Sequence, residues 1–371
     1  MKRILIVAGE ASGDQHGADL VNALKQETPE LQFVGIGGDK MKAAGVQLLY
    51  HISEFAVLGI SEVVRHIPFF RRVLRELQGE IKRNIDAVIL IDYPGFNLRL
   101  ARIAHEAGKK VIYYICPQLW AWGEKRVRKI KRYVDLALVI FEFEREFFAR
   151  HGVSAIWVGH PLVDQLNAVH LSRAAFLAQH QLPADGKILA LLPGSRPQEV
   201  QTLLPEMIQA ISPWKSRFTV LVGKSPTVDL SVYRQWLPEE VKLIEHQTHA
   251  LMKHADVAIV ASGTATLELG YFATPMVVVY KVSPLTYWIG KMMVKIENIA
   301  LVNIVAGKTI VPELIQHQAT AHSIQVQLQR LIEDSAYYER VKTELSVIKN
   351  RLGPPGASKR AAQKIMELLN E

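Results

Sequence analysis

The feature that most constrains the fold is a repeated alternation of short apolar runs with helix-like segments. Residues 4–8 form a continuous apolar run within a predicted strand at 3–8, and a helix is predicted to follow at about 13–26. Continuous apolar runs separated by helices indicate a parallel sheet that is covered on both faces. In the first half, the predicted strands are 3–8, 32–36, 86–92, 110–116, 136–140 and 155–158, and the further predicted helices are 61–84 and 98–107.

The same pattern restarts in the second half of the chain. A chain of 371 residues is long enough for two such domains, each with its own core. We therefore predict a doubly wound α/β domain at 1–175, a second at 185–345, and a helical tail at 346–371. Two such sheets facing each other predict a ligand cleft between their carboxyl ends. The predicted strands of the second domain are 187–192, 218–222, 241–244, 257–260 and 276–280.

Composition limits the class and compartment of the protein. A hydrophobic fraction of 49% with 22% charged residues is typical of a globular protein. Cys116 is the only cysteine, so no internal disulfide or cysteine zinc cluster is expected, and a reducing cytosol fits. No window reaches the roughly 18 apolar residues of a spanning helix, and the run at 4–7 is too short for a signal peptide. We expect a cytoplasmic protein that is soluble or peripheral to a membrane.

Positive charge is not evenly spread along the chain but gathers in two clusters. The net charge is +8, with 44 basic and 36 acidic residues, and six cations lie within 125–132. Six more lie between 65 and 83. Such clusters attract nucleic acid, anionic lipid or phosphorylated substrates, although a solvated helix face is the alternative for each.

Two segments, 63–74 and 285–296, combine apolar and basic side chains. This combination suits a membrane interface or an acyl groove, with ordinary core packing as the alternative. No RNA-binding signature accompanies the cations, so we expect an anionic membrane surface and no nucleic acid as a partner. The side chains expected to contact lipid are Phe69, Phe70, Arg71, Arg72, Tyr287 and Trp288.

Residues 256–268 indicate a nucleotide site in the second domain. An apolar run ends there in a small, hydroxyl-rich turn, and a helix-like segment follows. The unpaired N–H groups and the positive dipole end of a helix attract phosphate, although simple capping by Ser262 and Thr264 is the alternative. The carboxylate of Glu268 lies about one helical turn after this turn, where it is placed to accept hydrogen bonds from sugar hydroxyls. The residues expected to contact a nucleotide are Ser262, Gly263, Thr264, Ala265 and Glu268.

A second phosphate signal follows the strand at 187–192. Gly194, Ser195 and Arg196 come directly after it. A guanidinium group binds phosphate through paired hydrogen bonds. Together with the turn at 262–268, this turn predicts a diphosphate site with two sides.

Two acidic side chains follow strands of the first domain. Glu10 lies in the turn after strand 3–8, where the glycine spacing does not fit a dinucleotide motif. Because a carboxylate repels pyrophosphate, we expect Glu10 to face a hydroxylated group, with helix capping as the alternative. Asp92 ends strand 86–92, where partial burial would raise its pKa and suit it to deprotonate a hydroxyl nucleophile. Capping of the helix near Asn97 is the alternative for Asp92.

No metal site or cofactor is expected. The 13 histidines are scattered, and none forms a His-x-x-x-His pair with a carboxylate partner. The charge of a phosphate would therefore be met by Arg196 and by helix ends.

Seven motifs that occur in order resemble the lipid-A-disaccharide synthase family. The resemblance covers nearly the whole chain. It implies a GT-B fold, with two Rossmann-like parallel-sheet domains and an interdomain cleft, and an inverting hexosyltransferase of Gram-negative bacteria. The motifs are Ala8–Asp14, Ile91–Asn97, Pro117–Trp122, Val158–Pro161, Leu192–Arg196, Ala261–Glu268 and Asn303–Gly307.

The resemblance also implies a reaction in lipid A and lipopolysaccharide biosynthesis. UDP-2,3-diacylglucosamine donates its sugar to the 6-hydroxyl of 2,3-diacylglucosamine 1-phosphate, giving the β-1,6-linked disaccharide 1-phosphate and UDP. Asp92 matches the aspartate that is essential in the family, and Glu10 matches its first-turn glutamate. The first domain would bind the acceptor and the second the UDP-sugar, without a metal. The other residues expected to bind substrate are Ser12, Asn97, Trp122 and Asn303.

Some points stay open at the level of sequence. Some family members have a second aspartate where this chain has Gly95, so the role of that acid is absent or displaced here. The resemblance implies a peripheral enzyme on the inner face of the inner membrane, and a homodimer is one option for its assembly. The acyl-chain length and the segment that contacts the bilayer are not determined by the sequence.

Two other functions fit part of the pattern. A UDP-sugar 2-epimerase shares the fold and the nucleotide turns, but it would need extra acids and a histidine around the sugar. It would also have no use for the apolar-basic segments. A peripheral membrane protein that only binds nucleotide sugars is the non-enzymatic alternative, and substitution of Asp92 by Ala separates it from a transferase.

Overall fold

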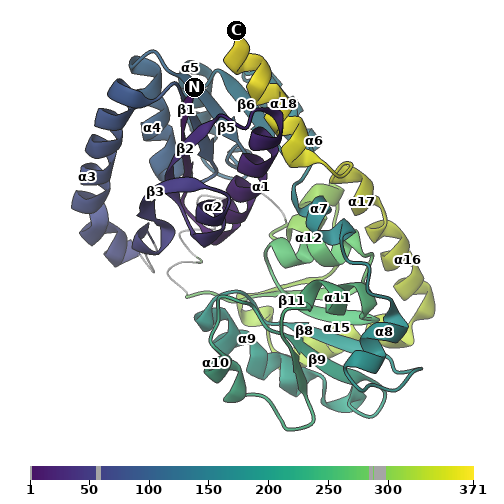
Figure 1. Cartoon of the computed structure of the whole chain (residues 1–371). Coiled ribbons are helices and arrows are strands. Elements are labelled where there is room, and N and C mark those ends of the chain that lie inside the picture. Colours follow the sequence, from purple (N-terminus) through teal and green to yellow (C-terminus); the bar gives the residue numbers. More distant parts are fainter. Residues whose placement is uncertain (1, 56–59, 284–286, 288–297) are drawn as a thin grey trace. The chain divides into compact units, whose positions relative to one another are not determined.

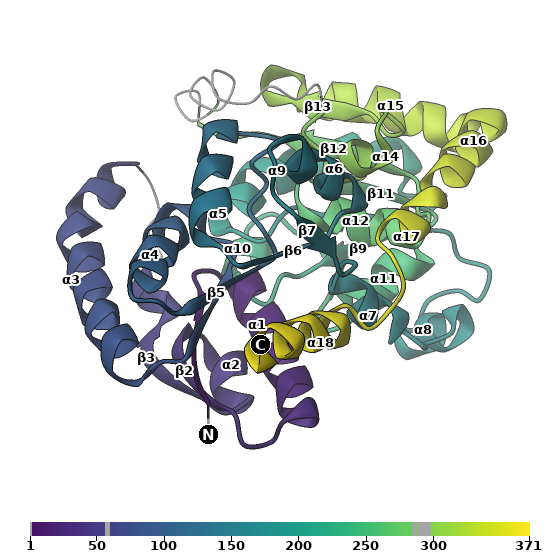
Figure 2. The ribbon, with the colours of Figure 1, turned by 90° about the horizontal axis from the view of Figure 1, so that it is seen from above.

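The chain forms two compact α/β units. The computed structural model describes residues 2–55, 60–283, 287 and 298–371. Unit 1 comprises Met1–Pro161 and Leu352–Glu371, and unit 2 comprises Leu162–Arg351 (Figures 1 and 2). Each unit is built around its own parallel sheet, as the sequence predicted.

The sheet of unit 1 has seven strands in the order β3-β2-β1-β4-β5-β6-β7. All neighbouring strands are parallel. The central strands are buried along nearly their whole length, because helices cover both faces. The strands are β1 (Arg3–Ala8), β2 (Gln32–Gly37), β3 (Val46–His51), β4 (Ala87–Ile91), β5 (Lys110–Tyr114), β6 (Leu136–Val139) and β7 (Ala155–Trp157).

The helices of unit 1 lie on the two faces of this sheet. Figure 1 shows α1 and α18 together on one side and α3 and α4 on the other. Val73, Leu77 and Ile81 are spaced four residues apart on α3, and all three are buried against the sheet. The helices are α1 (Ala11–Glu27), α2 (Asp39–Ala43), α3 (Ile60–Asn84), α4 (Pro94–Glu106), α5 (Val127–Tyr133), α6 (Glu142–Arg150) and α18 (Ala357–Asn370).

Unit 2 contains a six-stranded parallel sheet in the order β10-β9-β8-β11-β12-β13. Its strands are β8 (Ile188–Leu192), β9 (Thr219–Gly223), β10 (Lys242–Ile244), β11 (Val257–Ala261), β12 (Met276–Tyr280) and β13 (Glu313–Ile315). Helix α9 packs against α10 and α15, whereas α12 packs against α11 and α14. The helices are α7 (Leu162–Asn167), α8 (Arg173–Gln179), α9 (Pro197–Ala210), α10 (Leu230–Arg234), α11 (Thr248–His254), α12 (Thr264–Tyr271), α14 (Leu301–Ala306), α15 (Ala321–Glu333), α16 (Ser335–Leu345) and α17 (Val347–Arg351).

The structure differs from the predicted boundaries in three ways. Strands β3 and β13 were not predicted, because β3 is a half-exposed edge strand and β13 has only three residues. Helix α4 begins at Pro94 instead of Leu98. The units divide after Pro161 rather than between 175 and 185, since α7 and α8 belong to unit 2.

The last helix also differs from the prediction of a separate tail at 346–371. Helix α18 returns to unit 1 and packs against α1. Its apolar face accounts for this, because Ala361, Ile365 and Leu369 recur at four-residue intervals and are buried. Leu352, which is also buried, accepts a hydrogen bond through its carbonyl from the backbone N–H of His160 at 2.8 Å.

Candidate active site

Two of the predicted residues lie where the strand order of unit 1 reverses. This point lies between β1 and β4, and Ala8 is paired there with Ile91. Glu10 follows β1 and Asp92 follows β4, so both leave the same edge of the sheet side by side. In doubly wound sheets this edge is where ligands bind.

Asp92 lies in a strained turn that the core holds in place. Asp92 and Tyr93 both have left-handed backbones, with φ of 43° and 47°, and such strain gathers at functional sites. The Asp92 carbonyl accepts hydrogen bonds from the Asn97 side-chain amide at 2.8 Å and from the Tyr113 hydroxyl at 2.7 Å. The N-cap of α4 is Tyr93, and no side chain in the described structure caps this helix, so Asp92 is not its cap.

The carboxyl of Asp92 has the ionisation expected of a general base. Desolvation by the surrounding protein and, second, the negative charge of Glu10 raise its pKa from 3.8 to about 6, although a hydrogen bond from the backbone of Tyr93 opposes the shift. The residue nevertheless keeps solvent exposure. At neutral pH, Asp92 is therefore mostly ionised and more basic than an ordinary carboxylate.

The turn that carries Glu10 is packed against Tyr93. A Cβ on Gly9 would lie 2.4 Å from Cγ of Tyr93, so only glycine allows the ring to pack against this turn. Glu10 stands at the N-cap of α1 but makes no side-chain capping bond there, so the capping alternative is wrong. Glu10 and Ser12 are exposed, and both are free to meet a ligand that carries hydroxyl groups.

A buried glutamate that the sequence reasoning missed supports the neighbouring motif. Glu144 is fully buried, and one of its carboxyl oxygens accepts a hydrogen bond from the Trp120 indole at 3.0 Å. Desolvation raises the Glu144 pKa to about 7 against the lowering effect of these hydrogen bonds. The predicted contact Trp122 is half-buried, and the Arg126 guanidinium lies 4.8 Å from its ring centroid. Glu144 also accepts from the backbone N–H of Phe141, the N-cap of α6, at 3.1 Å. Because phenylalanine offers no side-chain acceptor, the sequence carries no capping-box signal here.

In unit 2, the two predicted phosphate turns leave neighbouring strands. Leu192 of β8 is paired with Val260 of β11, and the strand order reverses between these strands. The turn at 193–196 and the turn at 262–265 therefore lie at one edge of the sheet. This is the arrangement that a two-sided diphosphate site needs.

Glu199, which the sequence reasoning did not single out, occupies the donors of the first turn. Its Oε2 accepts from the backbone N–H groups of Ser195 at 2.9 Å and Arg196 at 3.3 Å. Its Oε1 lies 3.3 Å from Nη1 of Arg196, whose side chain is 68% exposed. Gly194 has a φ of 123°, and a Cβ there would collide with Glu199. A phosphate at this turn would therefore compete with the Glu199 carboxylate.

The turn at 262–265 leads into helix α12, whose N-terminus has no side-chain cap among the described residues. Gly263 is the N-cap of α12, with φ 157° and ψ −161°, a region open essentially to glycine alone. No side chain of the described residues caps α12; the Ser262 hydroxyl donates instead to the Ile299 carbonyl at 3.4 Å, and Thr264 is exposed. The capping alternative is thus wrong. The first N–H groups of α12 lie at the half-exposed residues 263–265, where an anion can reach them.

Glu268 lies next to a recess at the same edge of unit 2. Its Oε1 is 3.7 Å from Nε2 of His249. His249 also lines a recess of about 590 Å³ that follows β9 and β10. Both polar and apolar residues line this recess, as in sites for small organic ligands. The other polar residues that line it are His170, Lys224, His246, Gln247 and Thr248.

Two predicted substrate contacts have structural roles instead. Asn303 is fully buried; its amide donates to the Val311 carbonyl and to Glu313, and its oxygen accepts from the N–H groups of Ile310 and Val311. Asn97 is also fully buried and donates to backbone carbonyls of the Asp92 turn. A side chain committed to such bonds has no donor left for a substrate.

The side chains predicted to contact lipid differ in their exposure. Phe69 and Phe70 are half-buried, and their rings pack against Phe55 at 5.4 and 5.7 Å, so core packing accounts for much of their surface. Arg71 and Arg72 are exposed. Tyr287 is half-buried, whereas Trp288 and most of the segment 285–296 lie outside the described residues.

The described residues contain neither a metal-ligand cluster nor a helix that could span a membrane. No group of three or more His, Cys, Asp or Glu side chains in this part of the chain could hold a metal ion. None of the helices in residues 2–55, 60–283, 287 and 298–371 is both long and apolar enough to cross a membrane. The only cysteine of the sequence, Cys116, is buried.

Comparison with known proteins identifies one family and one fold. A family model for lipid-A-disaccharide synthetase matches residues 4–365. The lipid-A-disaccharide synthase of Myxococcus xanthus is 42% identical over 378 residues, covering 99% of this chain and 97% of that protein. Among solved structures, the calicheamicin glycosyltransferase CalG4 has a TM-score of 0.64 at 18% identity, covering 100% of this chain and 98% of its own. The UDP-GlcNAc 2-epimerase of Neisseria meningitidis bound to UDP-GlcNAc has a TM-score of 0.63 at 13% identity, covering 99% and 100%. The fold is thus of the GT-B type, shared by glycosyltransferases and epimerases.

Proposed function

The chain belongs to the lipid-A-disaccharide synthetase family, and from that premise we propose a role for each of its two sheet edges. The family membership makes it a glycosyltransferase of lipid A biosynthesis. We propose that the donor is UDP-2,3-diacylglucosamine and the acceptor 2,3-diacylglucosamine 1-phosphate, with the β-1,6-linked disaccharide 1-phosphate and UDP as products.

Asp92 is the proposed general base of unit 1. The 6-hydroxyl oxygen of the acceptor attacks the anomeric carbon of the donor, the bond from that carbon to UDP breaks, and Asp92 accepts the hydroxyl proton. The raised pKa of Asp92, beside Glu10 at the sheet edge, is the observation that carries this assignment. Glu10 has two proposed effects. Its negative charge keeps Asp92 basic. Its carboxylate also accepts hydrogen bonds from hydroxyl groups of the sugar that receives the transferred residue, and the Ser12 hydroxyl forms hydrogen bonds with the same groups.

Unit 2 is the proposed UDP site. The leaving diphosphate carries the charge that develops in the transition state, and positively polarised donors fixed around it lower the barrier. Arg196, the N–H groups of Ser195 and the bare N-terminus of α12 at Gly263–Ala265 supply such donors. Glu268 accepts from the ribose hydroxyls, and the recess beside His249 holds the uracil base. Asn303 has no part in this site, because its hydrogen bonds lie within the core.

The likeness in fold to an epimerase does not change this assignment. Structures related at 13% and 18% identity share only the fold with this chain. The family match over residues 4–365 separates the transferase from the epimerase. The non-enzymatic alternative is disfavoured by the raised pKa of Asp92, for which a protein that only binds has no use.

The enzyme is proposed to work on the anionic inner face of the inner membrane. The exposed cations of α5 and its preceding turn support this, since polybasic surfaces bind anionic headgroups. Reversal of these charges should release the protein from vesicles that contain phosphatidylglycerol but leave turnover of a detergent-dispersed acceptor intact. The exposed cations in question are Lys125, Arg128, Lys129, Lys131 and Arg132. A homodimer is a further proposal, which sedimentation of the purified protein tests directly.

Product formation from the purified enzyme is the decisive test of the reaction. The diacylated donor and acceptor should give disaccharide and UDP, whereas plain UDP-N-acetylglucosamine should be a poor donor. Asp92→Asn should lower kcat by about two to four orders of magnitude, and the exposed Asp185→Asn should have no effect. Equal use of the unacylated sugar would reject the lipid assignment, and unchanged turnover in Asp92→Asn would reject the base.

A further inference from the structure

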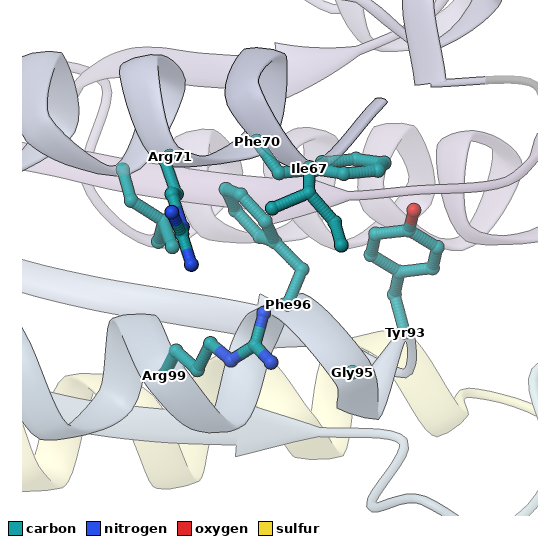
Figure 3. Close-up of a pocket in the computed structure, with 8 residues that line it drawn as sticks. Ile67, Phe70, Arg71, Tyr93, Gly95, Phe96 and Arg99 are labelled. Carbon is teal, nitrogen blue, oxygen red and sulfur yellow. The ribbon is translucent and has the colours of Figure 1, made fainter. Parts of the chain in front are cut away.

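A recess in unit 1 lies next to the turn that carries Asp92. It has a volume of about 640 Å³, within the usual range of ligand sites. Tyr93, Gly95 and Phe96, which directly follow Asp92, form one wall. Ile67, Phe70, Arg71 and Leu74 of α3 form the other (Figure 3). The recess is therefore continuous with the proposed acceptor side of the site.

The two ends of this recess differ in chemistry. Figure 3 shows Arg71 from α3 and Arg99 from α4 toward one end and the Tyr93 ring toward the other. The side chains of Ile67, Phe70 and Phe96 lie between the two helices. Apolar groups with cations at one end suit a ligand that carries both an alkyl chain and an anion.

Arg71 and Arg99 differ from Arg72 and Arg102 on the same helices. Arg72 pairs with Glu76 at 4.0 Å, and Arg102 pairs with Glu106 at 3.5 Å. Neither Arg71 nor Arg99 forms an ion pair with any residue that the structure describes. Two cations from different helices that line one recess supply the donors that an anion needs, because guanidinium groups bind phosphate in paired geometry.

Gly95 leaves the entrance of this recess open. A Cβ at position 95 would meet nothing within 4 Å. Gly95 lies in the first turn of α4, where an acidic side chain is also favourable for the helix. An aspartate here would thus fit sterically, but it would place a carboxylate in the recess that holds Arg99.

We propose that the recess between α3 and α4 binds the acceptor, with an acyl chain against Ile67, Phe70 and Phe96 and the phosphate against Arg71 and Arg99. This inference rests on the proposed transferase function and adds to it the residues that select the acceptor. Glucosamine 1-phosphate carries its phosphate on C1 and its 6-hydroxyl on the exocyclic C6, so the two groups are separate points of recognition on the sugar. The 6-hydroxyl would lie at the Tyr93 end, which is next in sequence to Asp92, and the phosphate at the end with Arg71 and Arg99.

The test compares the acceptor with and without its 1-phosphate, both as short-chain forms dispersed in detergent. The wild-type enzyme should prefer the phosphorylated acceptor by about ten- to a hundredfold in kcat/KM, the range of a hydrogen bond to a charged group. Arg99→Gln and Arg71→Gln should each remove most of this preference through KM and leave the dephosphorylated acceptor unaffected. Arg102→Gln, one turn along α4, is the matched control and should keep the preference.

The outcomes separate this inference from the proposed function. If the wild type makes no disaccharide from either acceptor, the transferase function fails. If it does, and Arg99→Gln lowers turnover of both acceptors equally or of neither, the phosphate site is wrong. If the arginine variants lose vesicle binding but keep the phosphate preference in detergent, the arginines contact the bilayer instead, which also overturns the proposal.

Two further variants test the recess without removal of an arginine. Gly95→Asp should raise KM for the phosphorylated acceptor and not for the dephosphorylated one, whereas Gly95→Ala should change neither. Ile67, at 39% exposure, tolerates a larger side chain, so Ile67→Trp should penalise long-chain acceptors more than short-chain ones. Equal effects of Gly95→Asp on both acceptors, or of Ile67→Trp on both chain lengths, would contradict the assignment.

Discussion

The side-chain amide of Asn97 donates a hydrogen bond to the backbone carbonyl of Asp92 at 2.8 Å. The same nitrogen donates to the Ile91 carbonyl at 3.1 Å. These bonds tie the left-handed turn of Asp92 to the first turn of α4. The backbone of the proposed base is thus held in place by a fully buried side chain.

Loss of the Asn97 amide should lower turnover more than substrate binding. We expect Asn97→Ala to reduce kcat by about ten- to a hundredfold, since small misplacement of a catalytic group is costly, and to leave KM for the donor nearly unchanged. Tyr113→Phe removes only the second bond to the same carbonyl and should have a smaller effect. Steady-state kinetics and thermal unfolding of both variants provide the check. A variant that loses stability but keeps kcat would show that Asn97 supports the fold alone.

The pH dependence of catalysis should report the pKa of Asp92. A general base acts only when it is ionised, so kcat/KM should fall below about pH 6. Because the negative charge of Glu10 raises the Asp92 pKa, Glu10→Gln should move this acid limb to lower pH. Glu27→Gln, an exposed change at the far end of α1, is the control. An acid limb that stays in place in Glu10→Gln would show that the two carboxylates are not coupled.

Arg196 and Glu199 should affect UDP binding in opposite directions. Arg196→Ala removes a charged donor and should weaken UDP binding by about ten- to a hundredfold. Glu199→Ala removes the carboxylate that competes for Arg196 and for the N–H groups of Ser195 and Arg196, so UDP should bind more tightly. It should also lower stability by about 1 kcal/mol through the lost cap.

Calorimetric titration with UDP measures both effects. Arg217→Ala, an exposed arginine of the same unit, is the control and should leave UDP affinity unchanged. Weaker binding in Glu199→Ala would mean that this carboxylate positions the turn instead of competing with phosphate.

The buried carboxyl of Glu144 should make stability depend on pH. Its folded-state pKa of about 7 lies above its ordinary value of 4.5, so its favourable contribution is present below about pH 4.5 and is lost as pH rises through 7. Between those limits the unfolding free energy of the wild type should fall, relative to that of Glu144→Gln, by on the order of 2–3 kcal/mol. Urea unfolding of both proteins at pH 5 and pH 8 measures this difference. If the difference in unfolding free energy between the wild type and Glu144→Gln is the same at pH 5 and pH 8, the raised pKa of Glu144 is contradicted.

The sequence predicted the sheets and the turns at their edges because both are local features. Strands such as β1 and β11 are continuous apolar runs, which have few conformations other than a buried parallel strand. The turns after β1, β4, β8 and β11 are recognisable from small, acidic or basic residues placed directly after those runs. The edge strand β3 and the short β13 escaped prediction, because neither carries a run of buried apolar residues long enough to stand out.

The roles of individual polar residues were harder to predict. Asn97 and Asn303 belong to motifs with polar, functional-looking patterns, yet both are buried and satisfy backbone groups. Glu144 and Glu199 looked like ordinary helical glutamates, and their hydrogen-bond partners come from packing or from the local turn. A side chain's partners depend on what the fold brings near it, and the sequence does not state that.

By itself, the sequence determined the two parallel sheets, the family, and the turns from which the proposed site is built. These depend on patterns over a few residues or on ordered motifs. Only the tertiary structure decided that β1 and β4 are neighbours, so that Glu10 raises the pKa of Asp92. It also decided that α3 and α4 enclose a recess lined by two arginines that form no ion pair within the described part of the chain. Strand order and helix packing are set by how all the apolar surfaces are buried together, so the charges that share one site emerge only when the chain is folded.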